Sequence, residues 1–475
     1  MTKKKFSLPN KVNEFIRKYQ LSAFLVYAVF FIMIMIVYRF IFLNIGDDSV
    51  SNRNIDIMNV PFSELMSYAY THGKSIFCRY WYTVMCYALL RIGGGIFWRP
   101  FIGFAYVVAA FALGKLFPIA GESHVKNAVI SCFAILLFPL LTMCEAGWLS
   151  TSIVYVVPLA FLLVGAIGLK KSFLQQKIKW YGYPVYLLCL YLGTCHEQSS
   201  TLFFGLVVFL VGYKVFKAIR DRKQPSIGRK PIASNVYFTI CCLLCTYQCY
   251  VAVTWPSNAD RLNSEIKGWF VEYLSLNTYD KLYLGFQDTM HYIIATKPVT
   301  LTILSVMLCL VIFTMYKDTL YRVLGLIPVG IMCVFGMFSD FFETLYPNLD
   351  YAFSQNVGTR NFINIRYYMS TMISLFLILI ICINIYLVFR NTFSSVFFAA
   401  LFCGGLCTRY IMGFSASLYA SLYRTAFFLF MTMIVIIFRL LSELRSRSRQ
   451  KLYPVGIALV VIFGALSMLD LILYV

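Results

Sequence analysis

The sequence is poor in charged residues, and poorest in acidic ones. Asp, Glu, Lys and Arg make up 13% of the 475 residues, about half of their share in soluble domains. There are 20 acidic residues against 41 Lys and Arg, while hydrophobic residues reach 60% and the mean hydropathy is +0.75. So little charge excludes a water-soluble fold and predicts a protein built for lipid.

The strict alternation of polar and apolar residues that a transmembrane β-barrel needs is also missing. Apolar runs of about 18 residues or more recur from Leu21 to the C-terminus, and runs such as Val435 to Phe438 are apolar on every side. Helices satisfy their own backbone hydrogen bonds in hydrocarbon. The predicted fold class is an all-α polytopic membrane protein, with residues 1–475 forming a single transmembrane domain.

Histidine is scarce, and the cysteines show no metal-ligand spacing. The chain has 4 His and 15 Cys, and most cysteines, such as Cys241 and Cys245, lie inside apolar runs. In that setting they act as small buried hydrophobic residues. We therefore predict neither a zinc site nor a disulfide framework.

The net charge of +21 would indicate a nucleic-acid partner in a soluble protein. Here the cations lie in short segments between apolar runs, as the positive-inside rule requires of cytoplasmic loops. We expect them to face the cytoplasm and the lipid headgroups, with no nucleic-acid partner. These segments are residues 1–20, 170–179, 214–230, 317–322, 390 and 439–451.

The first apolar run is too long for a signal peptide and is interpreted as a retained helix that follows a cytoplasmic N-terminus. Residues 80–117 hold either one crossing or two. Only one crossing in this stretch puts all the later basic loops on the same side as the N-terminus. Residues 80–97 are therefore interpreted as a surface or re-entrant helix. The segments predicted to cross, about thirteen, are 21–43, 102–116, 125–144, 150–169, 182–198, 201–218, 233–254, 298–316, 323–342, 367–389, 394–412, 421–440 and 454–474.

This topology places most other polar residues on the outer face. They fall mainly in a first outer loop at 44–98, a large loop at 255–297 and a further loop at 343–366. In the first loop, Pro61 and Gly73 mark the start and the stop of an amphipathic helix, which is expected on the membrane surface.

Asp47 and Asp48 follow the first predicted span directly. An acidic pair is unfavourable at a helix C-terminus, where the macrodipole already places negative charge, so a functional role would explain it. The two carboxylates can act as a general base or hold a divalent cation. The alternative is a solvated helix end.

His196, Glu197 and Gln198 interrupt two apolar runs at the level of the interface. Ionisable groups are costly there and usually functional, although a tight turn is the alternative. Glu197 could accept sugar hydroxyls or pair with a cation, and His196 could carry a proton.

Glu145, Trp148 and Tyr155 place a carboxylate and two aromatic rings beside another span. They are candidates for substrate binding. Trp148 could equally be a residue of the aromatic belt at the interface.

Several arginines on the outer face run against the positive-inside trend. A Pro-Ser-Asn turn ending at Asn258 precedes Arg261, Arg424 begins an apolar span, and Arg366 ends the outer loop 343–366. Guanidinium groups suit phosphate oxygens, which they bind bidentately. Pairing with a nearby acid such as Glu343 is the alternative.

In their order along the chain, these motifs resemble a family of bacterial membrane proteins with glucosyltransferase-like features, within the C-type glycosyltransferase superfamily. The resemblance covers most of the chain. It rests on Gly46-Asp47-Asp48, Trp148 to Tyr155 with Pro158, His196-Glu197-Gln198, Pro256 to Arg261, and Ser417 to Arg424.

The chain departs from the family pattern at two places. It has His72-Gly73-Lys74 where the family tends to have Asn-Gly-Arg, and Pro256-Ser257-Asn258 where the family has Pro-Gly-Asn. Lys74 keeps the charge but loses the bidentate fork. With Arg79, in the same loop, it is assigned to substrate binding.

The resemblance implies a bacterial plasma-membrane enzyme that uses a polyprenyl-phosphate sugar donor and a cell-envelope glycan or lipid acceptor. Asp47 or Asp48 would activate the acceptor hydroxyl or hold a cation, and the arginines would neutralise the departing phosphate. The alternatives are a transporter or flippase, a polymerase of lipid-linked glycans, and a non-catalytic envelope scaffold. Transporters usually carry their charges at the bilayer midplane, in broken helices.

Overall fold

The structure is a computed structural model in which all regular elements of the described residues are helices. The backbone is described for residues 21–41, 43, 46–48, 57–76, 78–92, 96–145, 147–220, 232–346, 366–389, 392–418, 420–447 and 451–474. An all-helical fold is therefore found throughout the described part of the chain.

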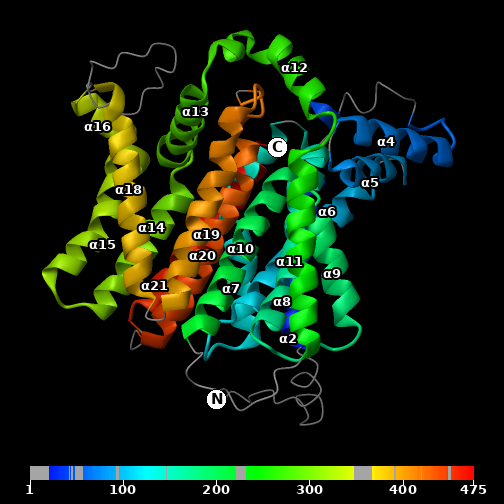
Figure 1. Ribbon diagram of the computed structural model, residues 1–475. Coiled ribbons are helices and arrows are strands. Elements are labelled where there is room, and N and C mark those ends of the chain that lie inside the picture. The colour runs from blue at the N-terminus through cyan, green and yellow to red at the C-terminus, as the bar shows by residue number, and fades with distance from the viewer. Residues whose placement is uncertain are drawn as a thin grey trace, which may run out of the picture.

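In the described part of the chain the helices follow one another without a sheet between them (Figure 1). Those of the first half are α2 (Leu21–Tyr38), α4 (Phe62–Ile76), α5 (Tyr80–Arg91), α6 (Trp98–Leu116), α7 (His124–Ile135), η2 (Leu140–Cys144), α8 (Trp148–Phe173), α9 (Gly182–Gly193), α10 (Glu197–Arg220) and α11 (Ile232–Val253). Those of the second half are α12 (Asn258–Trp269), η4 (Val271–Ser275), α13 (Thr278–His291), η5 (Tyr292–Thr296), α14 (Val299–Met315), α15 (Thr319–Met332), η6 (Cys333–Met337), α16 (Ser339–Leu345), α18 (Arg366–Val388), α19 (Thr392–Tyr410), η8 (Ile411–Phe414), η9 (Leu422–Ala426), α20 (Phe427–Arg447) and α21 (Tyr453–Tyr474).

Nine helices of the described residues are long and apolar enough to cross a membrane. The segment 278–296 and α14 form a further pair, bent by 77°, which would make ten. α2, α7 and α9 are apolar but shorter. Each segment predicted to span overlaps one of these helices, and the fold agrees with a polytopic membrane protein.

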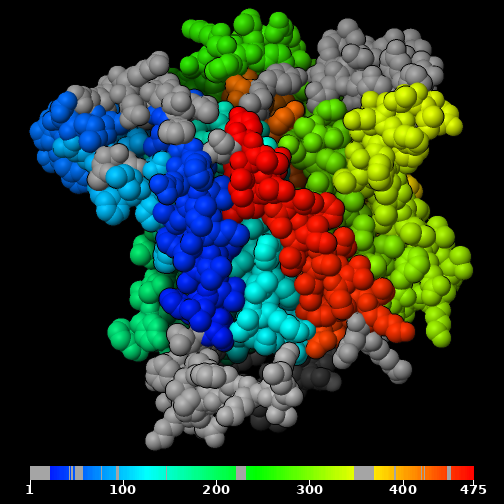
Figure 2. Space-filling view, turned by 180° about the vertical axis from the view of Figure 1, so that it is seen from behind, coloured from blue at the N-terminus to red at the C-terminus, as the bar shows by residue number. Residues whose placement is uncertain are grey.

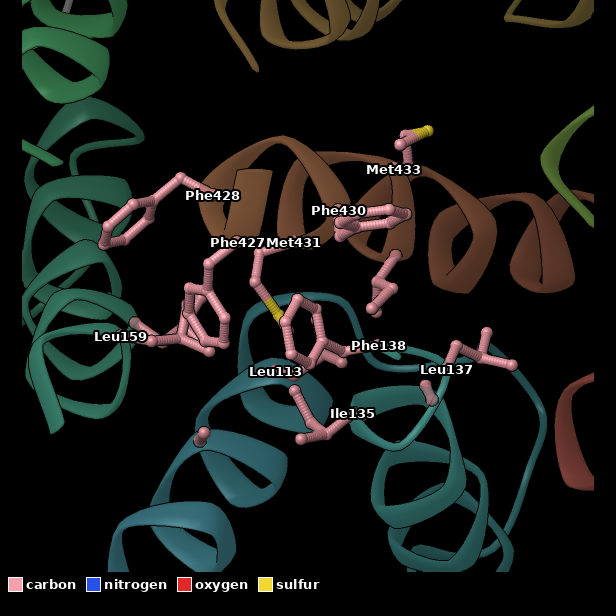
Figure 3. Packing of buried hydrophobic residues seen from close by; sticks show 14 of the residues in the cluster. Leu113, Ile135, Leu137, Phe138, Leu159, Phe427, Phe428, Phe430, Met431 and Met433 are labelled. Carbon is pink, nitrogen blue, oxygen red and sulfur yellow. The ribbon is translucent and has the colours of Figure 1, made fainter. Parts of the chain in front are cut away.

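α8 and α20 form the centre of the bundle. The most apolar windows of these helices are 78% and 89% buried by the rest of the protein, against 22% for α10. Phenylalanines of α20 pack across the core onto Phe138, which follows α7; the ring centroids of Phe138 and Phe427 lie 4.8 Å apart (Figure 3). α8 and α20 therefore form the core of the bundle, against which the other helices pack.

The predicted span 125–144 is interrupted in its middle. α7 ends at Ile135 because Pro139 cannot continue a helix, and a short 3₁₀ helix, η2, follows. Hydroxyl groups of other helices satisfy two of the carbonyls released by the break. Thr300 donates to the Leu137 carbonyl at 2.9 Å, and Ser467 donates to the Phe138 carbonyl at 2.8 Å.

The first outer loop contains the predicted helix, but with a different end. α4 begins after Pro61 and continues beyond Gly73 to Ile76. Gly73 is needed for contact with α5 rather than as a stop, because a Cβ atom there would lie 2.9 Å from the Cβ of Thr83. The two helices therefore pack closely against each other (Figure 1).

The bundle has two distinct ends. α4, α5 and α12 lie at one, which we call the loop end (Figure 1). At the other, the basic end, Lys126 and Arg445 both pair with Glu122, at 3.5 and 3.2 Å, and Lys170 donates to the carbonyl of Leu116. Seen from behind, α2 and α21 run between the two ends with α7 between them (Figure 2).

Candidate functional site

Asp48 caps the N-terminus of α8. Its carboxylate accepts hydrogen bonds from the amide groups of Leu149 and Ser150, at 3.0 and 2.9 Å, and from the Ser150 hydroxyl. Gly147 allows this approach, because its φ is +107° and a Cβ atom there would lie 2.6 Å from Cγ of Asp48. A carboxylate at this position compensates the free amide groups and the positive end of the helix dipole.

This arrangement changes the predicted role of Asp48. The side chain is 1% exposed, and burial raises the pKa of its carboxyl, although the hydrogen bonds from Ser150 and Leu149 oppose the shift. Because both oxygens face N–H donors, Asp48 does not fit a cation shared with Asp47. Its carboxylate stabilises the fold at α8 rather than facing a substrate.

Asp47 is exposed, and its negative charge acts on Arg79. Burial lowers the pKa of Arg79, but the negative charge of Glu197 and, more weakly, that of Asp47 raise it above its ordinary value. Asp47 is therefore within electrostatic reach of Arg79. Of the predicted acidic pair, Asp47 is the exposed member, and its charge acts on Arg79.

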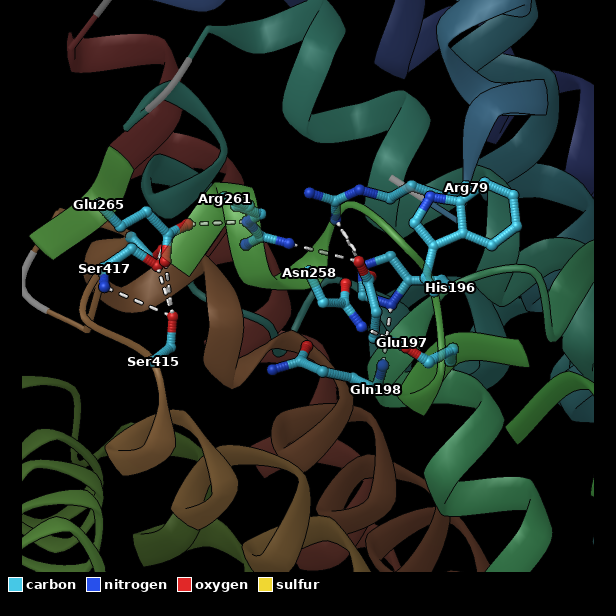
Figure 4. Close-up of polar contacts among 12 residues, drawn as sticks. Arg79, His196, Glu197, Gln198, Asn258, Arg261, Glu265, Ser415 and Ser417 are labelled. Carbon is cyan, nitrogen blue, oxygen red and sulfur yellow. Dashed lines mark hydrogen bonds and ion pairs between the residues drawn. The ribbon is translucent and has the colours of Figure 1, made fainter. Parts of the chain in front are cut away.

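Arg79, His196, Glu197 and Arg261 come together at the loop end, and we call them the Arg79 cluster (Figure 4). The carboxylate of Glu197 lies between two guanidinium groups. One of its oxygens is 3.6 Å from Nη1 of Arg79, and the other is 3.5 Å from Nη1 of Arg261. The cluster joins residues from before α5, from the start of α10 and from α12.

His196 is the buried member of the Arg79 cluster. Nη1 of Arg79 donates to its Nε2 at 3.0 Å, and its ring packs against those of Tyr155 and Phe428, with centroids 5.2 and 5.4 Å away. Burial lowers the pKa of His196 to about 3; Arg79 and Arg261 act in the same direction, and Glu197 opposes them. The imidazole is therefore neutral near pH 7, which does not suit the predicted role as a proton carrier.

A chain of polar contacts fixes Arg261 to the opposite side of the site. Its Nε donates to Glu265, one turn further along α12, at 2.8 Å. The other oxygen of Glu265 accepts from Ser415 at 3.1 Å, and Ser415 lies 2.8 Å from Ser417 (Figure 4). Arg261 thus connects Glu197 to the segment that follows η8.

Three other predicted residues hold the surrounding elements in place. Asn258 donates to the carbonyls of Ala252 and Val253, at 3.0 and 3.2 Å, and so caps the C-terminus of α11. Gln198 donates to the carbonyls of Thr408 and Thr425, at 3.1 and 2.9 Å. It therefore ties α10 to α19 and η9.

Glu145, the third of these residues, holds η9 in place. It accepts from the backbone amides of Tyr423 and Arg424, both at 2.8 Å, and burial raises the pKa of its carboxyl while these bonds and the charge of Arg424 oppose the shift. Arg424 also acts electrostatically on Tyr155, as Arg79 does. Arg424 and Tyr155 thus lie close enough to the Arg79 cluster to share its field.

The remaining predicted residues lie elsewhere. Trp148 is 2% exposed and packs edge-on against Tyr38, with centroids 6.2 Å apart, so its ring lies in the core and not in the Arg79 cluster. Lys74 is exposed, and its ammonium lies 5.7 Å from the ring of Tyr70 rather than in the Arg79 cluster. The side chain of Arg366 lies outside the described residues, as does most of the predicted loop 343–366.

The sequence prediction missed one pair, Arg409 and Asp288. They form an ion pair inside the bundle, between α19 and α13, with 1% and 9% of their side chains exposed. Arg409 falls inside the apolar run predicted as a span, and an arginine in such a run is a signal of a buried partner. Its charge also acts on Tyr155, whose ring packs against His196 of the Arg79 cluster.

Among the residues that the structure describes, no group of three or more His, Cys, Asp or Glu could hold a metal ion. A search of protein-family models, of curated proteins and of solved structures finds no match to this chain. Its function must therefore be inferred from the geometry of the site.

Proposed function

We propose that this protein is a membrane glycosyltransferase of the C-type superfamily. It would move a sugar from a polyprenyl-phosphate donor to a cell-envelope glycan or lipid acceptor. The observation that supports this proposal is the Arg79 cluster, in which partly exposed arginines and a carboxylate from distant segments meet at one end of an apolar bundle. Such a position suits a substrate with a lipid tail and a phosphate at the interface.

In the proposed arrangement the chain crosses a bacterial plasma membrane about thirteen times. The N-terminus lies in the cytoplasm, and the loop end faces outward. The gathering of Lys126, Lys170 and Arg445 at the basic end supports this orientation.

In the proposed reaction, Asp47 takes the proton of an acceptor hydroxyl whose oxygen attacks the anomeric carbon of the donor sugar. The new glycosidic bond forms as the bond between the anomeric carbon and the phosphate oxygen breaks. The phosphate leaves with the electron pair, and the configuration inverts. Arg79 and Arg261 stabilise the charge that develops on the leaving phosphate, with Arg424 close by.

Glu197 has a defined part in this proposal. It occupies the space between Arg79 and Arg261 that a phosphate would need, at 3.5 and 3.6 Å from the two guanidinium groups. A bound phosphate would replace it as their partner, and Glu197 would then be available to accept a sugar hydroxyl. Before substrate binds, its charge holds the two arginines side by side.

The base is tested by Asp47→Asn in purified protein supplied with a polyprenyl-phosphate sugar. We expect sugar transfer to fall at least about 100-fold, the usual effect of losing a general base. Asp260→Asn is the matched control, because Asp260 is an exposed acid on α12 at the same end. Full activity of Asp47→Asn would remove Asp47 from the mechanism.

The phosphate site is tested by Arg261→Gln, with Lys267→Gln on the same helix as the control. Losing a charge-assisted contact should raise the KM for the donor by about 10-fold and leave the KM for the acceptor unchanged. An equal effect on both substrates would argue against a phosphate at Arg261.

A transporter is the second candidate, and one observation favours it. The segment 278–296 meets α14 at a bend of 77° next to Pro298, and the buried Asp288 lies on that segment. Broken helices with buried charges are typical of transport paths. Protein in vesicles that moved a labelled lipid-linked sugar across the bilayer without transferring it would support this candidate over the enzyme.

A further inference from the structure

An apolar cavity of about 460 Å³ lies between α6, α8, α10, α19 and α20. Its wall is formed almost wholly by aliphatic and aromatic side chains, and Figure 3 shows Leu159, Phe428 and Met431 among them. The polar side chains on the wall are Ser394, Thr432, Lys170 and Arg439. Water gains little in such a space, whereas a hydrocarbon chain would fill it favourably.

The residues of α20 that line the cavity extend from Phe428 to Arg439. Phe428, at one end, lies against His196 of the Arg79 cluster, with ring centroids 5.4 Å apart. Arg439, at the other end, follows three turns later on α20, a distance of about 16 Å along the helix. Half of the hydrocarbon core of a bilayer measures about 15 Å.

The two cations stand together where the cavity reaches the basic end. Lys170 donates to the carbonyl of Leu116, while Arg439 bonds to Glu443 at 2.7 Å and to Ser442 at 3.0 Å. Lys170 and Arg439 are close enough for their charges to oppose each other. With one carboxylate for two cations, this part of the cavity wall keeps a positive charge that an anionic group would neutralise.

We infer that this cavity binds one acyl chain of an anionic phospholipid, with the lipid phosphate against Lys170 and Arg439. The positive charge of Lys170 and Arg439 favours an anionic headgroup, and the lined stretch of α20, about 16 Å, matches a chain that spans half of the hydrocarbon core. A polyprenyl chain is several times longer than the space available. The site is separate from the Arg79 cluster and does not depend on the function proposed for it.

The inference is tested by native mass spectrometry of the purified protein with added phosphatidylglycerol, phosphatidylethanolamine or polyprenyl phosphate. We expect one tightly held phosphatidylglycerol and much weaker binding of the other two. Lys170→Gln/Arg439→Gln should lower the affinity for phosphatidylglycerol about 25-fold, since each cation near a membrane surface contributes a factor of about five. Ala166→Phe should lower it too, because the new ring would occupy the cavity.

Lys171→Gln/Arg445→Gln is the matched control. It removes the same two charges from the same end, but Lys171 lies over the ring of Tyr186 and Arg445 pairs with Glu122, both away from the cavity wall. This variant should bind phosphatidylglycerol as the native protein does. Equal binding of phosphatidylethanolamine, an equal loss in the control, or tighter binding of polyprenyl phosphate would overturn the inference. If Ala166→Phe does not fold, the charge variants decide the result.

Discussion

The Arg79 cluster and the Arg409–Asp288 pair are built from the same chemical groups, but they differ in their access to water. The side chains of Arg79, Glu197 and Arg261 keep 16%, 30% and 28% of their surface exposed, with nitrogen–oxygen distances of 3.5 and 3.6 Å. Those of Arg409 and Asp288 keep 1% and 9% and are in direct contact. A loose, hydrated pair can exchange its partner for a ligand at little cost. A buried pair cannot lose one member without leaving the other charge stranded.

The largest effect should therefore come from breaking the buried pair. Arg409→Met leaves the Asp288 carboxylate without its cation inside the bundle and should reduce the free energy of unfolding by about 3–5 kcal/mol. Thermal unfolding in detergent measures this effect. The double variant Arg409→Met/Asp288→Leu should recover most of the loss, because replacing both charges removes the stranded group. If the double variant were as unstable as the single one, the pair would have a role beyond mutual neutralisation.

Within the Arg79 cluster, the buried and neutral ring of His196 differs from the partly exposed, charged side chains beside it. Its pKa is about 3 in the folded protein, against 6.5 for an ordinary histidine. The unfolded chain therefore binds a proton that the folded one does not, and stability falls as the pH drops below 6.5. Between pH 7.5 and 5 the loss should be about 2 kcal/mol.

This loss is measured as a decrease in Tm between the two pH values. His196→Gln should lose that part of the decrease, whereas His124→Gln, at an exposed histidine on α7, should keep it. An unchanged pH dependence in His196→Gln would mean that the ring is protonated in the folded state.

The same contrast between buried and exposed groups divides Asp47 from Asp48. Asp48→Ala removes the cap of α8 and should reduce stability by about 1–2 kcal/mol, the usual effect of losing an N-terminal cap. Asp47→Ala should leave Tm nearly unchanged, because Asp47 is exposed. Both are measured by thermal unfolding. Equal effects of the two changes on Tm would show that Asp48 does not act as a cap.

The residues of the Arg79 cluster could be predicted from the sequence, but their roles could not. Glu197 stands out because it interrupts two apolar runs, and Arg261 stands out because it runs against the positive-inside trend. Whether such a residue faces water or a backbone depends on the close packing of distant segments. Asp48 meets the start of α8 about a hundred residues further along the chain, and no local pattern reveals that contact.

The helices, too, could be predicted where the signal is local and not where it depends on distant contacts. Their apolar runs were visible because hydrophobicity acts locally, and each predicted span overlaps a helix. The break after α7 was missed, although Pro139 marked it, because a run of apolar residues continues on both sides of the proline. Arg409 was missed because it lies within such a run, and its partner Asp288 is far away in the sequence.

The smallest effect on stability should come from Glu197, although it has two cationic partners. Glu197→Gln removes one carboxylate from two partly hydrated contacts of 3.5 and 3.6 Å, and solvent screens the repulsion that remains between Arg79 and Arg261. The free energy of unfolding should therefore change by less than about 1 kcal/mol. A much larger loss of Tm would mean that Glu197 holds the loop end together, as Asp288 holds Arg409. A small change would leave the Arg79 cluster as the part of the molecule whose charges are not needed for folding, which is the property expected of groups that bind a ligand.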